Sequence, residues 1–241
     1  MESQEYALMD AAEGRMWWYR ALHARLADAL AGVGGAVLDA GCGTGGLLAA
    51  LRRTRPDLAL AGIEWSDTAA RRAADKSGAV IARGSVNALP FAAASFDAAV
   101  VADVLCHNAV DPVAALAELL RVLRPGGVLV VNMPAYAWLL STHDRQVHNV
   151  RRWTAAGTRA ALHQAGFTGV RARYWNGLLL PLMVLHRKLL ARDDGAASDV
   201  APFSPWLDAT LHAITAIERR LPVPLPAGGS VLATAIRPPP P

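Results

Sequence analysis

Lysine and cysteine are scarce in this chain of 241 residues. Only Lys76 and Lys188 are lysines among its 24 basic residues, so the net charge of +4 comes almost entirely from arginine. The two cysteines, Cys42 and Cys106, exclude a disulfide framework. Such sparse cysteine is typical of a reducing compartment, and we expect a cytoplasmic protein.

Long uncharged apolar runs are also missing. No stretch reaches the roughly 20 residues of a transmembrane helix, and the acidic, polar residues 1–5 do not resemble a signal peptide. The arginines occur in pairs with acidic residues nearby, and most pairs lack the interleaved aromatic residues that stack on bases. We therefore expect a soluble protein with no nucleic-acid partner.

What the chain does contain is a glycine turn after a short apolar strand. Residues 37–48, VLDAGCGTGGLL, predict a buried strand, a turn and the start of a helix. Gly41, Gly43 and Gly45 allow backbone amides to approach a ligand closely, and Asp39 stands where the strand ends. This pattern predicts a pocket for a nucleotide-type cofactor.

The spacing of the glycines fits two cofactors. Gly41, Gly43 and Gly46 also satisfy the dinucleotide fingerprint G-x-G-x-x-G, with Glu64 near the position of a ribose-binding acid. Asp39 favours S-adenosylmethionine, because a carboxylate beside the turn repels a pyrophosphate but suits an amino group and a sulfonium. A dehydrogenase is the alternative for this turn.

Four segments of residues 37–131 occur in the order and at the spacing of a known family. They are VLDAGCGTGGLLAAL, AGIEWS, GSVNALPFAAASFDAAVVADVLCHN and LLRVLRPGGVLVV. Here the chain resembles the class I S-adenosylmethionine-dependent methyltransferases, specifically the group around methyltransferase type 11. The resemblance implies an α/β fold with a Rossmann-like, doubly wound sheet of seven strands, mostly parallel with the last strand antiparallel.

The resemblance also implies contacts to the adenosine half of S-adenosylmethionine. We expect Glu64 to accept hydrogen bonds from both ribose hydroxyls and Trp65 to lie against the adenine ring. The Val86 backbone amide is expected at the same ring. Ser85 departs from the family, which usually has an acid at this position to contact the adenine amino group.

Further contacts are expected at the methionine half of the cofactor. The Ala102 carbonyl resembles the family's contact to the cofactor amino group, and Arg20, after the aromatic cluster 17–19, is expected to pair with the cofactor carboxylate. The complete predicted cofactor set is Asp39, Gly41, Cys42, Gly43, Gly45, Glu64, Trp65, Ser85, Val86, Ala102 and Arg20.

We expect one methyltransferase domain over residues 1–241. Apolar residues at helical spacing predict helices within an N-terminal segment, 1–34, ahead of the first strand. About fifty residues between the sixth and seventh strands are too many for a hairpin and predict a helical insertion or lid, 177–228. Its first helix, 178–192, is apolar and then basic, which fits a lid over an apolar acceptor, a homodimer surface, a membrane-surface contact or ordinary core packing.

Residues 138–154 are expected to form a substrate loop. They follow the fifth strand, have poor helical periodicity and are rich in polar donors. The pattern His-Asp…His-x-x-Arg-Arg-aromatic-Thr resembles an element near the acceptor pocket of the type 11 relatives. The predicted acceptor contacts are Trp18, Tyr19, Tyr136, Asp144, Arg152 and Trp153.

Histidines in the loops over the active face are the candidates for a general base. They are His107, His143 and His148, and an oxygen acceptor would benefit from such a base whereas a neutral nitrogen acceptor needs none. Loop-stabilising hydrogen bonds are the alternative for each of them. A metal site built from His143, Asp144 and His148 lacks an evident further ligand, so we predict no metal.

The sequence thus predicts methyl transfer to a small-molecule acceptor of partly apolar character, at an oxygen or a nitrogen. The donor already carries an activated methyl group, so the protein chiefly aligns the two reactants and excludes water. A non-catalytic protein that binds S-adenosylmethionine and docks to a partner through its insertion is the alternative.

Overall fold

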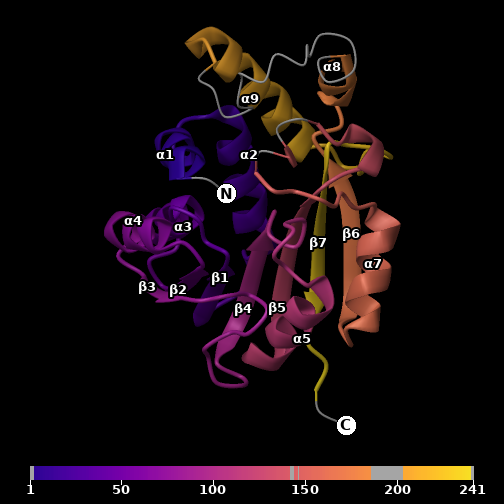
Figure 1. The fold of residues 1–241 in the computed structure, drawn as a ribbon. Helices are drawn as coiled ribbons and strands as arrows, with labels where there is room; N and C mark the ends of the chain where they lie inside the picture. The colour runs from indigo at the N-terminus through magenta and orange to yellow at the C-terminus, as the bar shows by residue number, and fades with distance from the viewer. Residues whose placement is uncertain (1–2, 142–143, 146, 186–202, 240–241) are drawn as a thin grey trace.

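The computed structural model describes residues 3–141, 144–145, 147–185 and 203–239 (Figure 1). Its centre is a seven-stranded sheet in the order β3-β2-β1-β4-β5-β7-β6. The strands are β1 (Ala36–Ala40), β2 (Ala59–Glu64), β3 (Val80–Arg83), β4 (Phe96–Ala102), β5 (Leu123–Pro134), β6 (Thr168–Trp175) and β7 (Ser230–Ile236). Strands β1 to β5 pair in parallel, whereas β7 lies antiparallel between β5 and β6. The predicted fold class is confirmed.

Strand order reverses between β1 and β4, which are neighbours in the sheet. In doubly wound sheets, ligands bind outside the carboxyl ends of the strands at such a reversal. Asp39 of β1 is paired with Val100 of β4, so the glycine turn after β1 and the loop after β4 begin side by side. In Figure 1 this is the upper edge of the sheet, where α1, α8 and α9 also lie.

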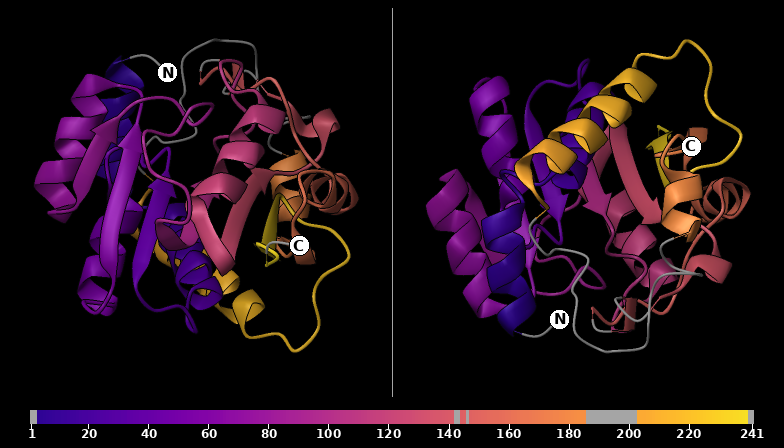
Figure 2. Two further views of the ribbon diagram at one scale, coloured as in Figure 1. Left: turned by 90° about the horizontal axis from the view of Figure 1, so that it is seen from below. Right: turned by 90° about the horizontal axis from the view of Figure 1, so that it is seen from above.

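Helices cover both faces of the sheet (Figure 2). On one face, apolar side chains of α2 (Trp17–Ala29), α3 (Gly46–Thr54) and α4 (Asp67–Ser77) form a core with the strands. On the other, α5 (Pro112–Val122) and α7 (Ala155–Gln164) do the same. Strands covered on both faces are mostly apolar, as β1 and β4 show: each contains one aspartate among apolar residues.

Helix α1 (Ser3–Ala12) was not predicted, although it falls within the expected N-terminal helical segment. It has no clear apolar stripe, which is the signal that helix periodicity relies on. Charged side chains hold it against α4 instead: Asp10 pairs with Arg72 at 3.5 Å and also with Lys76. Tertiary ion pairs of this kind have no local sequence signature.

The helical insertion between β6 and β7 is confirmed by α8 (Leu180–Leu185) and α9 (Pro205–Arg219). The expected helix 178–192 extends past residue 185, so its basic end lies outside the described residues. Within the described part, Leu178 and Leu182 are about half exposed. No helix in the described ranges combines the length and apolar character needed to cross a bilayer.

Helix α9 is fixed to α2 by a buried ion pair. Arg25 of α2 and Glu218 of α9 approach to 3.4 Å with side chains only 4% and 5% exposed. The Arg25 guanidinium also lies 4.6 Å from the ring centre of Trp175, at the end of β6. The Glu218 carboxylate accepts three further hydrogen bonds, from the backbone amides of residues 176–178 at 2.6, 2.8 and 3.0 Å. One carboxylate therefore joins both ends of the insertion to the N-terminal layer.

Replacing Glu218 with alanine is expected to lower the free energy of unfolding by about 3–5 kcal/mol, because it leaves a buried guanidinium and three amides without their acceptor. Urea denaturation measures the change. Asp28→Ala is the matched control: it breaks the exposed Asp28–Arg219 pair between the same two helices and should cost less than about 1 kcal/mol. Equal losses in the two variants would contradict this account.

Candidate cofactor and active site

The glycine turn has the backbone that its sequence requires. Gly41, Gly43 and Gly45 have φ angles of +87°, +54° and +87°, in the left-handed region that favours glycine. A Cβ atom at Gly41 would lie 2.4 Å from Cγ2 of Val104, in the loop after β4. At Gly45 it would lie 2.7 Å from Cα of Ala73 in α4. The turn is therefore in close contact with both neighbouring elements.

Glu64, at the end of β2, is the hydrogen-bonding centre of this region. Its side chain is buried, and its Oε2 atom accepts a hydrogen bond from the Gly43 amide at 3.0 Å. Its Oε1 atom accepts from the Ser66 amide at 2.9 Å and from the Tyr6 hydroxyl of α1 at 3.0 Å. The carboxylate thus connects the turn, the start of α4 and α1, and its predicted role as a ribose ligand stays a prediction.

Helix α1 lies directly over the turn. Besides the contact of Tyr6, the methyl group of Met9 would be 2.7 Å from a Cβ atom at Gly43. Burial, followed by the charge of Glu64, raises the pKa of Tyr6, so its hydroxyl stays a donor. Sequence reasoning missed Tyr6 and Met9 because nothing in residues 3–12 marked them as neighbours of a turn some thirty residues away.

A second buried carboxylate, Glu13, occupies the start of α3. It accepts a hydrogen bond from the Thr44 hydroxyl at 2.7 Å, pairs with Lys76 and is hydrogen-bonded by the Gly46 amide. Backbone amides at a helix N-terminus are where dinucleotide-binding folds hold a pyrophosphate. Because the chain fills this position with its own anion, the geometry disfavours the dehydrogenase alternative and suits a cofactor without phosphate.

Asp39 lies at the end of β1 with 4% of its surface exposed. Burial, and then the charges of Glu13 and Glu64, raise the pKa of Asp39 to about 7. The same burial and the neighbouring carboxylates raise the pKa of the Cys42 thiol, which stays protonated. Three carboxylates around one turn make a site that favours a cation, as an amino group or a sulfonium would provide.

The residues expected at the adenine ring follow neighbouring strands. Trp65, directly after β2, is 75% exposed, so one face of its ring is free to receive a planar group. Val86 is buried after β3, the strand that pairs with β2. The Ser85 hydroxyl accepts a hydrogen bond from the Asn87 amide at 3.2 Å, which occupies it inside the loop. The roles of these residues stay predictions.

The residue after Ala102, at the end of β4, is a carboxylate that sequence reasoning did not select. Asp103 has a left-handed backbone, with φ of +55°. Both of its carboxylate oxygens accept hydrogen bonds from the side-chain Nδ2 of Asn132 at 3.0 Å. Trp175 Nε1 donates to Asn132 Oδ1 at 2.8 Å. The sequence did contain a signal for Asp103: it is a polar residue directly after a buried strand, at the point where the strand order reverses.

The predicted histidines have different environments. His107 is hydrogen-bonded to the backbone of Val147 and of Asp103, and burial lowers its pKa. His148 is exposed, with a left-handed φ of +60°. His143 lies outside the described residues. Their catalytic roles stay predictions.

Two charged residues of the expected substrate loop bind each other. Arg152 Nη2 donates to the two carboxylate oxygens of Asp144 at 2.9 and 2.8 Å, and both side chains are almost fully buried. Asp144 also accepts from the amide and hydroxyl of Ser141, and Arg152 donates to the Ala135 carbonyl at 3.1 Å. This pair shapes the loop from inside, and the predicted acceptor contacts of Asp144 and Arg152 stay untested.

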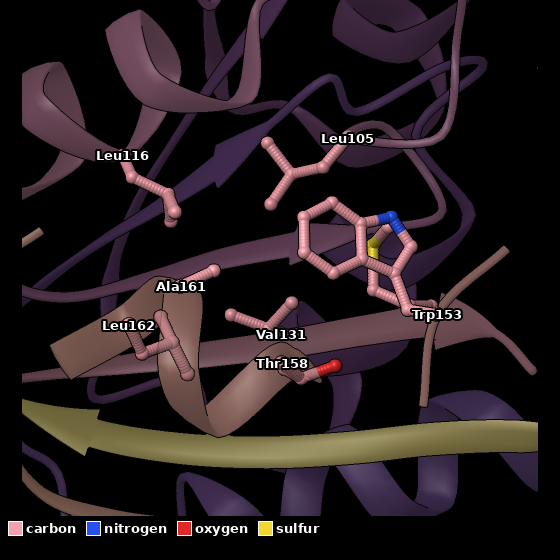
Figure 3. A pocket seen from close by; sticks show the side chains of 8 residues that line it. Leu105, Leu116, Val131, Trp153, Thr158, Ala161 and Leu162 are labelled. Atoms are coloured by element: carbon pink, nitrogen blue, oxygen red, sulfur yellow. The ribbon is translucent and has the colours of Figure 1, made fainter. Parts of the chain in front are cut away.

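The aromatic side chains of the predicted acceptor contacts pack against other parts of the protein, and their roles as acceptor contacts stay predictions. Tyr136 lies between Trp138 and Tyr174, with ring centres 5.6 and 5.1 Å away, and burial raises its pKa to about 12. Trp153 lines an apolar cavity of about 10 Å³ between β5, α5 and α7 (Figure 3). That volume is no larger than a single water molecule requires, so the cavity is a packing gap rather than an acceptor pocket.

The aromatic cluster of α2 faces the end of β6 and the insertion. Trp18 stacks on Trp175 with ring centres 6.3 Å apart and meets Tyr19 edge-on at 5.1 Å. Arg20, expected at the cofactor carboxylate, instead contacts α9: it lies 3.5 Å from Asp208 and 3.2 Å from Nδ1 of His212. Its role at the cofactor stays a prediction. Within the described ranges, His, Cys, Asp and Glu side chains form no group of three suited to a metal.

Residues 38–131 match the family described as the methyltransferase domain. A demethylmenaquinone methyltransferase of Beutenbergia cavernae is 33% identical over 168 residues, covering 59% of this chain and 60% of that protein. A ubiquinone/menaquinone biosynthesis C-methyltransferase of Geobacter sulfurreducens is 35% identical over 106 residues, or 41% of each chain. The chain spans between 30% and 60% of the length of the curated relatives it matches.

Among solved structures, a possible histamine N-methyltransferase from Thermotoga maritima matches with a TM-score of 0.61 and 17% sequence identity. The match covers 97% of this chain and 95% of that one. At this identity the likeness establishes the fold alone. It extends the methyltransferase fold over the N-terminal helices and the insertion, which the family match at residues 38–131 does not reach.

Tyr6→Phe is expected to tighten the binding of S-adenosylhomocysteine by about 3–10-fold, because the ribose no longer has to displace a hydrogen bond to Glu64. Isothermal titration calorimetry measures the dissociation constant. Tyr174→Phe, which removes a hydroxyl bonded to the Ala155 amide, should leave the constant unchanged. Weaker binding by Tyr6→Phe would instead make the hydroxyl a cofactor ligand.

Binding of S-adenosylmethionine is expected to strengthen as the pH rises from 5 to 7 and to level off above 7. A cationic ligand favours the ionised Asp39, whose pKa near 7 means that binding at lower pH must release a proton, at a limit of tenfold in affinity per pH unit. Asp39→Asn should flatten this dependence, whereas Asp57→Asn, at the exposed Arg55 pair, should keep it. A persistent slope in Asp39→Asn would assign the proton to another group.

Proposed function

We propose, from the methyltransferase domain carried by residues 38–131, that this chain transfers the methyl group of S-adenosylmethionine to a small-molecule acceptor of partly apolar character. The observation that carries the proposal is the turn after β1. There, the buried Glu64 carboxylate accepts the amide of Gly43, which supports a role in binding the ribose, and Asp39 favours a cation, while Glu13 fills the position that a pyrophosphate would need.

The apolar character of the acceptor is supported by the insertion. Exposed apolar side chains occur along its described parts, from Leu178 and Leu182 to Trp206, which is 71% exposed. Helices α8 and α9 of the insertion lie at the carboxyl edge of the sheet, the edge at which the turn after β1 begins (Figure 1). The names of two relatives refer to quinones, which have partly apolar character, and the name of the Geobacter sulfurreducens relative adds a carbon atom to the oxygen and nitrogen atoms considered as acceptors.

Calorimetry with S-adenosylhomocysteine, followed by incubation with methyl-labelled S-adenosylmethionine, tests the proposal. The acceptors to be tried are a reduced naphthoquinone, a catechol and a secondary aliphatic amine, which offer a carbon, an oxygen and a nitrogen. We expect binding and transfer of label to one of them. Glu64→Gln should weaken cofactor binding at least tenfold, because an amide accepts fewer of the ribose hydrogen bonds. Absence of binding by the folded protein would overturn the proposal.

A non-catalytic protein that binds the cofactor and docks through its insertion is the second candidate, favoured by the exposed Leu178, Leu182 and Trp206. It predicts cofactor binding without turnover on any of the three acceptors, together with a partner complex. Polar replacement of Leu178 and Leu182 would then abolish the complex while leaving the affinity for S-adenosylhomocysteine unchanged.

A further inference from the structure

Asp103 is a carboxylate beside the donor turn that no cofactor contact considered so far uses. Register pairs Asp39 with Val100, so the chain leaves β4 next to the point where it leaves β1. The adjacent residue, Val104, places its Cγ2 atom 2.4 Å from where a Cβ atom of Gly41 would lie. Asp103 is half-buried as a whole residue, and Asn132 Nδ2 donates to both oxygens of its carboxylate.

We propose that Asp103 is the proton acceptor for the methyl-transfer reaction and contacts the nucleophilic group of the acceptor molecule. This inference rests on the proposed function. It assigns to a carboxylate directly after β4 the task that the sequence indicated for a histidine.

The geometry of Asp103 is fixed by its neighbours. Its amide donates to the Asn132 carbonyl at 2.8 Å, and the Asn132 side chain donates to both carboxylate oxygens. Asn132 is in turn held by Trp175 Nε1. Each carboxylate oxygen retains a lone pair for another donor. A strained, left-handed residue whose side chain is held this rigidly is a common device for orienting a reactive group.

The charges around Asp103 keep it a useful base near neutral pH. The pKa of Asp103 is raised to about 7: burial is the largest cause and the charge of Asp144 adds to it, while the Asn132 hydrogen bond and the charge of Arg152 act in the opposite direction. Cys106 and His107, on the same loop, are the other titratable groups close to it: the charge of Asp103 helps raise the pKa of the Cys106 thiol, and burial lowers the pKa of His107. Proton acceptors work best when their pKa lies near the working pH.

The histidines are worse placed for this task. The ring of His107 is hydrogen-bonded to the backbone of Asp103 and Val147, which orients it within the loop, and burial lowers its pKa. His148 is exposed, next to Asn149, which forms an isolated bridge with His107. Asp103 alone of these three combines a fixed orientation with a position beside the glycine turn.

The reaction balances with Asp103 as the base. A lone pair or carbon–carbon π-electron pair of the acceptor attacks the methyl carbon as the bond to sulfur breaks. The electron pair of that bond stays on sulfur, which becomes the neutral thioether of S-adenosylhomocysteine. The proton that leaves the O–H, N–H or C–H group of the acceptor passes to the Asp103 carboxylate and then to water. No oxidant or metal is needed.

Rate measurements with the acceptor that is methylated among the three named above test the inference. In the wild type, kcat should rise with pH and level off above about 7, since the ionised carboxylate is the active form. Asp103→Asn should lower kcat about 100–10,000-fold and abolish the pH dependence, with the affinity for S-adenosylhomocysteine unchanged. Asp103→Glu should recover part of the rate, which a purely structural role would not require.

Asp111→Asn is the matched control. It makes the same chemical change in the same loop. Asp111 caps α5 by accepting the Val113 amide, and an asparagine is an equally good cap. Wild-type kcat is expected. If Asp103→Asn retains the wild-type rate and pH profile while the wild type is active, the inference is wrong and the proposed function stands. If the wild type is inactive and does not bind S-adenosylhomocysteine, both the inference and the proposed function are wrong.

A second measurement needs no acceptor molecule. In protein labelled at the aspartate carboxyl carbon and saturated with S-adenosylhomocysteine, one NMR signal absent from Asp103→Asn should titrate near pH 7. That result supports the inference whichever acceptor is used. A midpoint below about 5 would overturn it, because the carboxylate would then be a weak base at neutral pH.

Discussion

The Glu64 carboxylate is the contact on which the arrangement of the site depends. It ends β2, accepts the amide of Gly43 in the turn after β1, and accepts the hydroxyl of Tyr6 from α1. Three segments far apart in the sequence are thereby held around one pair of oxygen atoms. A buried carboxylate is stable there because its hydrogen bonds are satisfied by the chain itself, and the same atoms can be given over to a sugar diol.

Buried carboxylates occur throughout the site as well as at Glu64. Asp39, Glu13 and Asp103 surround the ends of β1 and β4, and all three have a pKa raised by burial. The cost of burying each carboxylate falls when a cation enters. The donor carries a sulfonium, which becomes a neutral thioether on transfer, so the site is electrostatically better matched to the reactant than to the product.

Much of the sheet and the cofactor turn could be predicted from the sequence, because buried parallel strands are apolar runs and left-handed turns need glycine. Strands β6 and β7 end and begin close to the predicted bounds of the insertion, 177–228. Helix α1 could not be predicted in this way, since ion pairs with α4 hold it rather than an apolar stripe. The contacts within the substrate loop could not be predicted from the sequence either. Whether Arg152 meets a ligand or Asp144 is decided by tertiary packing, and an Arg–Asp pair eight positions apart has no local signature.

The insertion enters and leaves the sheet at a single point. The Gly229 amide donates to the Asn176 carbonyl at 3.2 Å, and a Cβ atom at Gly177 would lie 2.4 Å from the Ala227 carbonyl oxygen. Because its two ends already meet, the segment between them can change in length and composition at little cost in loop entropy and without moving β6 or β7. The insertion can therefore be replaced as one segment. A replacement of this kind would change the surface offered to the acceptor and leave the glycine turn and its contacts as they are.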